Sequence, residues 1–184
     1  MLEQKVQELL QQQLSIKLHL GCGPVKLDGY LNVDGEYCAG DPNIVIHNIT
    51  EAYPIPNNSV DEILSIHVIE HIEHRKVLPM FVEWHRILKP GARVILEWPD
   101  LLKACEFIAA NPESLISDDN RVLKRSIYTI YGRDYKNQVM RHVYGYSIAS
   151  MSKLLMESGF STVRPEDVLY SKTPSDSRVV AYKS

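Results

Sequence analysis

The sequence predicts one α/β domain in which a parallel or mostly parallel β-sheet is covered by helices on both faces. Short apolar runs rich in β-branched residues alternate with longer segments whose apolar residues recur at helical spacing, and this alternation is typical of such sheets. A length of 184 residues, with 45% hydrophobic and 23% charged residues, is ordinary for one globular domain. We therefore expect a single domain over residues 1–184.

Seven apolar segments are predicted as strands because turn-forming residues bound them and because many of their residues are β-branched. They span residues 16–21, 30–34, 43–48, 60–66, 93–99, 160–163 and 179–182. The first two strands are unusually close in sequence, with only residues 24–29 between the glycine-rich turn and the second strand. A crossover between parallel strands usually needs a dozen or more residues. The helix of this first connection must therefore be shortened or lost.

Helices are predicted where apolar residues recur every three or four positions. They cover residues 1–15, 73–88, 101–110, 122–131 and 147–158. The residues 101–146 form a long, tyrosine-rich insertion after the fifth strand. Inserts at this position of a scaffold commonly carry function, so we expect a lid over a substrate site. The N-terminal helix is expected to pack on the edge of the sheet. A role in forming a homodimer is the less favoured alternative.

The net charge and the cysteine content limit the binding partners and the cellular compartment that we expect for this protein. A net charge of −3 and a pI near 6.2 argue against a general nucleic-acid binder, which normally carries a basic patch. The cysteines Cys22, Cys38 and Cys105 are odd in number and contain no Cys-x-x-Cys pair, which suits a reducing compartment. No apolar stretch reaches about 18 residues. We expect a cytoplasmic protein that binds neither nucleic acid nor membrane.

The glycine-rich turn after the first strand is the first candidate for a binding site. Gly21, Cys22 and Gly23 follow a buried apolar run, and glycine allows a tight turn that a ligand can approach closely. Asp34 ends the second strand, where an acid can accept hydrogen bonds from ribose hydroxyls. Together they predict a nucleoside site. The fingerprint of nicotinamide-dependent dehydrogenases is not met, because the third glycine is missing and the acid comes too early.

Five segments in order resemble the class I S-adenosylmethionine-dependent methyltransferases, in particular the type-11-like group. The segments are Leu18-His19-Leu20-Gly21-Cys22-Gly23, Asn32-Val33-Asp34, residues 60–72, Arg86-Ile87-Leu88-Lys89-Pro90-Gly91-Ala92, and Leu154-Leu155-Met156-Glu157-Ser158-Gly159-Phe160. The resemblance implies a Rossmann-like, doubly wound sheet of seven strands whose last strand is antiparallel. It also implies S-adenosylmethionine as the cofactor, S-adenosylhomocysteine as the product, and methyl transfer as the reaction.

The cofactor-binding residues that the resemblance implies lie after the first four strands. They are Gly21, Cys22 and Gly23 under the methionine part, Asp34 at the ribose, Asn48 and Ile49 beside the adenine, and Ile66 and His67 toward the sulfonium. Two features depart from the family pattern. Pro24-Val25 replaces the usual continuation to a third glycine, and His19 stands where the family usually carries an acid. The histidine puts the contact with the methionine ammonium in doubt.

The methyl acceptor is expected to be a small molecule, attacked at oxygen or nitrogen, and the resemblance favours a sugar or polysaccharide precursor. A hydroxyl acceptor benefits from a general base, most often histidine. His71 and His142 are the candidate bases, and Glu97 is a candidate for orienting the acceptor. Both histidines also have a structural alternative. His71 can be a hydrogen-bond partner of the backbone, and His142 can be a solvated loop residue.

Two other functions are considered. His67-Val68-Ile69-Glu70-His71 matches the His-x-x-Glu-His motif of inverted zinc proteases, in which two histidines on one helix bind zinc and the glutamate is the base. The strand-like residues 63–66 directly before His67 argue against that helix, so no metal is expected. The second alternative is a methyltransferase-like binding module without catalytic activity.

Overall fold

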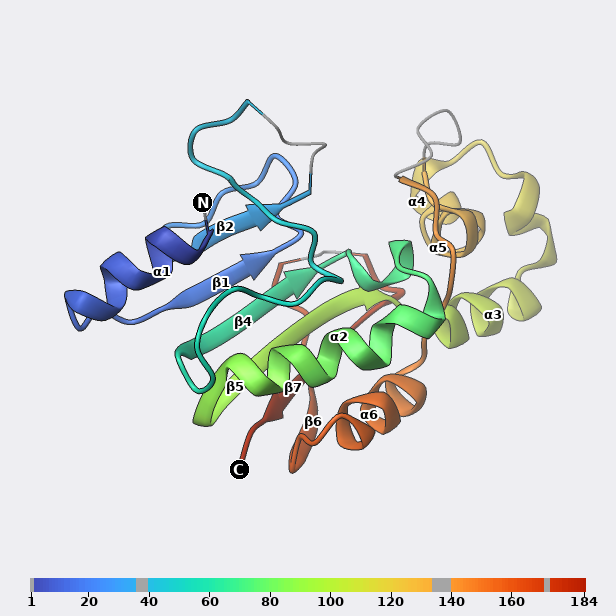
Figure 1. Ribbon diagram of the computed structural model, residues 1–184. Coiled ribbons are helices and arrows are strands. Elements are labelled where there is room, and N and C mark those ends of the chain that lie inside the picture. The colour runs from blue at the N-terminus through green and yellow to red at the C-terminus, as the bar shows by residue number, and fades with distance from the viewer. Residues whose placement is uncertain (1, 36–39, 134–139, 171–172) are drawn as a thin grey trace.

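The computed structural model describes residues 2–35, 40–133, 140–170 and 173–184, so Cys38 lies outside the described part. It contains a seven-stranded sheet in the order β3-β2-β1-β4-β5-β7-β6 (Figure 1). The strands are β1 (Lys17–Leu20), β2 (Leu31–Asp34), β3 (Val45–Ile46), β4 (Val60–Ile66), β5 (Leu88–Pro99), β6 (Thr162–Glu166) and β7 (Asp176–Tyr182). All seven predicted strands are present.

Strand direction follows the prediction. Strands β1 to β5 are parallel to one another, and the last strand, β7, is antiparallel to both of its neighbours, β5 and β6. The register places Leu18 of β1 between Leu31 of β2 and Ile63 of β4. The carboxyl ends of β1, β2, β4 and β5 therefore meet at one edge of the sheet, which is where ligands bind in open α/β folds. The predicted fold class is confirmed.

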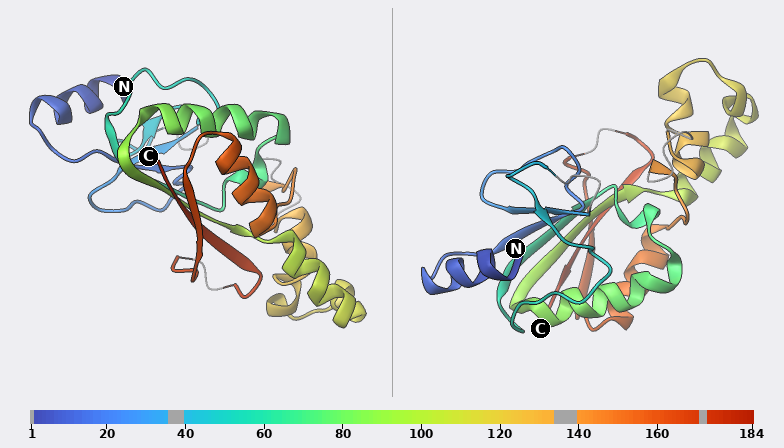
Figure 2. Two further views of the ribbon diagram at one scale, coloured as in Figure 1. Left: turned by 90° about the horizontal axis from the view of Figure 1, so that it is seen from below. Right: turned by 45° about the horizontal axis from the view of Figure 1, so that its top comes forward.

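One face of the sheet carries helices (Figure 2). The helices α2 (His74–Ile87) and α6 (Ile148–Glu157) pack on it, and α1 (Leu2–Gln11) joins the same core through Leu2 and Val6. In α2, Val77, Phe81 and Trp84 recur at the spacing of one helical face and are fully buried. Burial of this apolar stripe holds α2 to the sheet.

The opposite face is covered differently. Among the described residues no helix lies on it; Leu27 and Tyr30 pack there against Leu64, and the backbone N–H groups of Leu169 and Tyr170 reach Glu97. The connection between β1 and β2 is too short for a full crossover helix, as the sequence predicts. Among the described residues, helices are thus present on one face and at one end of the sheet, whereas loops cover the other face. This differs from the expected helices on both faces, because the short connection between β1 and β2 leaves no room for a helix there.

The predicted lid follows β5. It contains α3 (Leu101–Ala110), the short 3₁₀ helix η3 (Pro112–Ile116), α4 (Asn120–Leu123) and α5 (Ile127–Tyr131). These helices gather beyond the carboxyl ends of β4 and β5 (Figure 1). The helix predicted over residues 122–131 is divided into α4 and α5, and residues 134–139 of the predicted lid are outside the described part. No helix in the described ranges has the length and hydropathy to span a membrane.

Candidate functional site

The turn after β1 and the acid after β2 are in direct contact. The N–H groups of Gly21 and Cys22 both donate to the carbonyl of Val33, at 2.8 and 3.1 Å. The carboxylate of Asp34 accepts from the N–H of Gly23 at 2.6 Å and from that of Gly35 at 2.8 Å. A carboxylate has about four acceptor positions, so Asp34 retains acceptor capacity beyond these two bonds.

The two glycines of this turn have different roles. Both adopt positive φ, but a Cβ on Gly21 would lie 2.3 Å from a methyl of Val68, whereas a Cβ on Gly23 would meet nothing within 4 Å. Gly21 is therefore needed for packing against the segment that follows β4. Gly23 instead leaves open space beside the Asp34 carboxylate, where a ligand can approach the backbone.

His19 does not replace the missing acid in function. Its ring is buried, lies edge-on to Tyr30 and bonds through Nδ1 to the side-chain oxygen of Asn32 at 3.1 Å. Burial lowers the pKa of His19, which favours the neutral ring. A neutral, buried imidazole offers no carboxylate to an ammonium group, so this part of the family pattern is absent from the chain.

The residues predicted beside the adenine and the sulfonium have local partners. Asn48 is exposed and closes a turn, because its side chain accepts from the backbone N–H of Thr50 and donates to Glu51. Ile49 packs on the main core, and Ile66 packs against the smaller cluster on the opposite face. Their roles toward a cofactor stay predictions.

His67 lies at the carboxyl end of β4 in a strained conformation. Its φ of 54° is rare for a residue with a Cβ, and such strain is often found at functional sites. Its Nε2 is 3.2 Å from the carboxylate of Asp176, and its Nδ1 is 3.4 Å from that of Glu70. Burial lowers the pKa of His67, but Asp176 and Glu70 outweigh burial and raise the pKa to about 10. His67 is therefore a cation held between two carboxylates.

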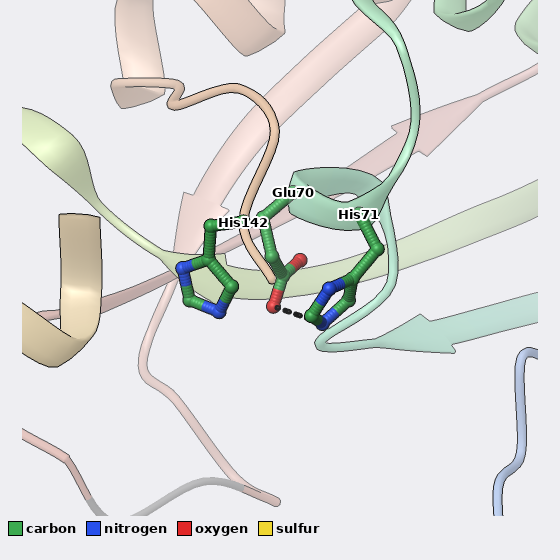
Figure 3. Close-up of side chains that lie close together, drawn as sticks. All are labelled: Glu70, His71 and His142. Atoms are coloured by element: carbon green, nitrogen blue, oxygen red, sulfur yellow. Dashed lines mark ion pairs between the residues drawn. The ribbon is translucent and has the colours of Figure 1, made fainter. Parts of the chain in front are cut away.

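Glu70, His71 and His142 come together although the two histidines are 71 positions apart in the sequence (Figure 3). The rings of His71 and His142 flank the carboxylate of Glu70, and one ligand atom of each side chain lies within 4.8 Å of the others. Nδ1 of His71 bonds to the carbonyl of Arg141 at 2.8 Å, and Nδ1 of His142 bonds to that of Thr129 at 2.9 Å. The sequence contains no pattern that pairs His142 with Glu70.

A pocket of about 280 Å³ contains these side chains. It is lined by His67, Glu70, His71, Pro99, Lys124, Tyr128, Thr129, Arg133, Met140, His142, Thr173 and Asp176. Val68 connects this pocket to the glycine turn, because it follows His67 and packs on Gly21. The two halves of the predicted site are thus adjacent, one after β1 and β2 and the other after β4 and β5.

Two sequence hypotheses do not match this geometry. The inverted zinc-protease motif needs a helix that includes both histidines, but His67 directly follows β4 at a positive φ, and only His71 belongs to the short 3₁₀ helix η2 (Ile69–His71). Glu97 is buried and engaged in the scaffold, since it pairs with Arg178 at 2.8 Å and accepts from the N–H of Leu169. It is therefore not oriented toward the pocket of His71 and His142.

Residues 18–96 match the family model described as a methyltransferase domain. This match covers the part of the chain that holds four of the five ordered segments, and it is consistent with a class I methyltransferase domain. Among solved structures, an S-adenosylmethionine-dependent methyltransferase from Archaeoglobus fulgidus is similar, with 17% identity, a TM-score of 0.63, and coverage of 98% of this chain and 93% of that one. One from Methanosarcina mazei has 16% identity, a TM-score of 0.57, and coverage of 95% and 96%.

A putative O-methyltransferase from Nostoc punctiforme is similar as well, with 13% identity and a TM-score of 0.59; the match covers 100% of this chain and 57% of that longer one. At such identities the similarity establishes the fold. No curated protein matches the sequence. The domain match and the fold together indicate an S-adenosylmethionine-dependent methyltransferase, as the ordered motifs predict.

The site of this methyltransferase fits the nucleoside part of S-adenosylmethionine. Asp34 offers acceptor positions for ribose hydroxyls, and the space at Gly23 lets a ligand lie against the turn. The cofactor carries no phosphate, so the glycines are needed for close approach and not for anion binding. The ammonium group requires an acceptor other than residue 19, because His19 is buried and neutral.

Proposed function

We propose that this methyltransferase transfers a methyl group to an oxygen or nitrogen of a small-molecule acceptor bound in the pocket that contains His71 and His142. The observation that supports it is the position of this pocket at the carboxyl ends of β4 and β5, one residue from the Val68–Gly21 contact. The glycine-rich turn after β1 and the pocket are therefore neighbours at the edge of the sheet where folds of this class bind ligands.

In this proposal the ends of β1 and β2 hold the cofactor. Asp34 receives the ribose hydroxyls, and the backbone from Gly21 to Gly23 lies along the methionine part. When bound, S-adenosylmethionine supplies a methyl carbon that an acceptor lone pair attacks as the carbon–sulfur bond breaks, leaving neutral S-adenosylhomocysteine. The protein contributes by orienting the acceptor and excluding water, which suffices for much of the rate in a displacement of this kind.

The chemistry of the pocket favours a polar acceptor with an anionic group. Lys124 and Arg133 line it on the lid side, and Tyr128 adds an aromatic surface with a hydroxyl. Sugars stack on aromatic rings, and phosphate or carboxylate groups pair with lysine and arginine. A sugar or polysaccharide precursor that carries such a group matches these residues.

His71 and His142 are the residues that we propose remove the acceptor's proton. A backbone carbonyl can only accept a hydrogen bond, so Nδ1 of each ring is protonated, and in the neutral ring Nε2 carries the lone pair. Nε2 can then receive the proton that a hydroxyl or amine loses on methylation. Burial lowers the pKa of His142, in agreement with a neutral ring.

The first test is calorimetric titration of the purified protein with S-adenosylmethionine and S-adenosylhomocysteine. We expect one site, and Asp34→Ala should weaken binding at least about tenfold because it removes charge-assisted hydrogen bonds. Asp28→Ala is the matched control, since Asp28 is an exposed acid on the turn between β1 and β2. Absence of binding by the folded wild-type protein would reject the enzyme and leave a binding module.

The second test is transfer of a labelled methyl group to a panel of nucleotide-linked and phosphorylated sugars, with neutral sugars and amines alongside. His142→Gln should reduce kcat by about 10²–10⁴-fold if His142 is the base, with little change in cofactor affinity. Equal turnover by the wild-type protein and the variant would show that His142 is not involved.

A further inference from the structure

We infer that Glu70, His71 and His142 form a binding site for a divalent transition metal ion, with zinc as the reference ion, at the wall of the acceptor pocket. Metal binding by these residues does not depend on the proposed methyl transfer, whereas a catalytic use of the metal does. The inference concerns a different set of residues from the His-x-x-Glu-His motif, because the lid residue His142 takes the place of His67.

The first observation is the state of the Glu70 carboxylate. Glu70 is 1% exposed, and neither of its oxygens has a hydrogen-bond partner. The nearest cationic group, Nδ1 of His67, is 3.4 Å away, within ion-pair distance but outside hydrogen-bond geometry. His67 thus compensates part of the charge of Glu70, but it leaves both oxygens without a hydrogen bond. A metal ion bound directly to the carboxylate would offset the remaining cost of burying it.

The second observation is the orientation of the two imidazoles. Nε2 of His71 lies 3.8 Å from Oε1 of Glu70, and the ring centroids of His71 and His142 are 5.0 Å apart at an angle of 78° (Figure 3). Because each Nδ1 donates to a backbone carbonyl, the neutral form of each ring carries its lone pair on Nε2, the nitrogen that a metal ion would bind. Two imidazole lone pairs and one carboxylate thus converge, and a shared cation would bind all three.

The third observation is that the ligands are fixed in place. Metal-binding histidines generally donate their second nitrogen to a carbonyl or carboxylate, and both rings do so here. The N–H of Val143 donates to the backbone carbonyl of Glu70 at 2.8 Å, which ties the lid segment to η2. The site therefore does not depend on a single mobile side chain.

The donor set selects the class of metal. Two imidazoles and one carboxylate are typical of zinc and other first-row ions and leave further coordination positions open, whereas magnesium prefers oxygen ligands. In a tetrahedral zinc site the ligand atoms are about 3.4 Å apart, so rotations that bring these side chains closer by about 1 Å are required. The open position would face the pocket, where an acceptor hydroxyl could bind and become more acidic. A bound metal would occupy both Nε2 lone pairs, so this acidification would replace proton removal by the two histidines.

The test uses the untagged full chain, stripped of metal with a chelator and titrated with zinc chloride. Calorimetry should show one zinc per chain, and cobalt as the probe should give visible absorption bands of a low-coordinate site. Zinc binding should weaken by more than about 100-fold in each of the variants His71→Gln, His142→Gln and Glu70→Gln. This loss is larger than the loss of about 10-fold to 100-fold expected for a residue that only orients a metal ligand. His47→Gln is the control, because His47 is a partly buried histidine outside the pocket.

Failure of the stripped wild-type protein to bind zinc, or unchanged zinc affinity in both histidine variants, would overturn the inference. Nε2 of one histidine would then carry a proton and serve as the cation beside Glu70. Glu70→Gln alters a buried residue and could prevent folding. In that case the zinc affinity of His142→Gln, a variant in the lid, tests the inference. Titration with S-adenosylmethionine on the same sample separates the hypotheses, because cofactor binding without zinc binding rejects only the metal site.

Discussion

At the scale of single residues, the glycine turn after β1 shows that neighbouring glycines can be required for different reasons. Gly21 has no room for a Cβ because Val68 packs against it, whereas the space around Gly23 is open. The first glycine therefore determines how the segment after β4 sits on the turn. The second determines how closely a ligand can approach.

We predict that Gly21→Ala destabilises the fold more than Gly23→Ala. Both substitutions place a Cβ at positive φ, which costs about 1–2 kcal/mol. Gly21→Ala adds the overlap with Val68, and overpacking of this kind costs about 1–3 kcal/mol more. Urea denaturation measures both free energies of unfolding. Equal losses would show that Val68 moves aside without cost.

His19 gives a prediction for the dependence of stability on pH. Burial lowers the pKa of His19 below the value of about 6.5 that it has in the unfolded chain. The unfolded state therefore binds the proton first, so the stabilising contribution of neutral His19 is present above about pH 6.5 and is lost as the pH falls below it. Between about pH 7.5 and pH 5.5, the free energy of unfolding should therefore fall less in His19→Gln than in the wild-type protein. An unchanged slope would contradict the buried, neutral state.

At the scale of elements, the connection between β1 and β2 shows how a loop takes over the position of a helix. The side-chain oxygen of Asn32 accepts from the N–H of Leu27 at 2.9 Å, and its amide donates to the carbonyls of Leu27 and Tyr30. These bonds hold Leu27 and Tyr30 against the sheet face that carries no described helix. One buried amide thus fixes a segment that lacks a helix's own hydrogen bonds.

The lid segment around Gly132 is held in a similar way. Gly132 has a φ of 84°, and a Cβ there would lie 2.3 Å from the carbonyl oxygen of Met140 and 3.2 Å from the ring of His142. The N–H of His142 also donates to the carbonyl of Tyr131 at 3.3 Å. The position of His142 therefore depends on the close approach at Gly132.

We predict that Gly132→Ala displaces His142 and weakens zinc binding by about tenfold to 100-fold, the range for residues that orient a ligand. Gly29→Ala is the matched control, because Gly29 has a φ of 78° but no atom within 4 Å of its Cβ position. Both variants bear the cost of positive φ, so only Gly132→Ala should change zinc affinity in calorimetry. Comparable affinities in the two variants would mean that the lid tolerates the extra methyl group.

At the scale of the whole molecule, the metal site would join two parts of the chain. Glu70 and His71 belong to the segment after β4, and His142 belongs to the lid inserted after β5. A ligand that binds only the folded state stabilises it by mass action. Zinc should therefore stabilise the whole domain and not only the pocket.

We predict that free zinc at a concentration about 100 times its Kd adds about 2.7 kcal/mol to the free energy of unfolding. For a chain of this length each kcal/mol raises Tm by about 2–4 °C, so the shift is measurable by thermal denaturation. The same concentration of magnesium should leave Tm unchanged, and His142→Gln should abolish the shift with zinc. A rise in Tm that persists in His142→Gln would place the metal elsewhere.

Much of the scaffold could be predicted because its signals are local. The apolar runs of β1 and β4 and the helical spacing of Val77, Phe81 and Trp84 in α2 follow from burial of one side of each element. The proximity of Gly23 and Asp34 was predictable as well, since parallel neighbouring strands bring their carboxyl ends together. Boundaries were less exact, as the division of residues 122–131 into α4 and α5 shows.

By itself, then, the sequence determined the seven-stranded, mostly parallel sheet and the proximity of Gly23 to Asp34, and it indicated His71 and His142 as separate candidates. Only the tertiary structure decided that Glu70 is buried between them, that His67 is paired with Asp176, and that helices are concentrated on one face of the sheet. The physical reason is that burial and charge pairing depend on residues far apart in the chain. Periodicity shows which side of an element is apolar, but packing determines which side chains then share one pocket.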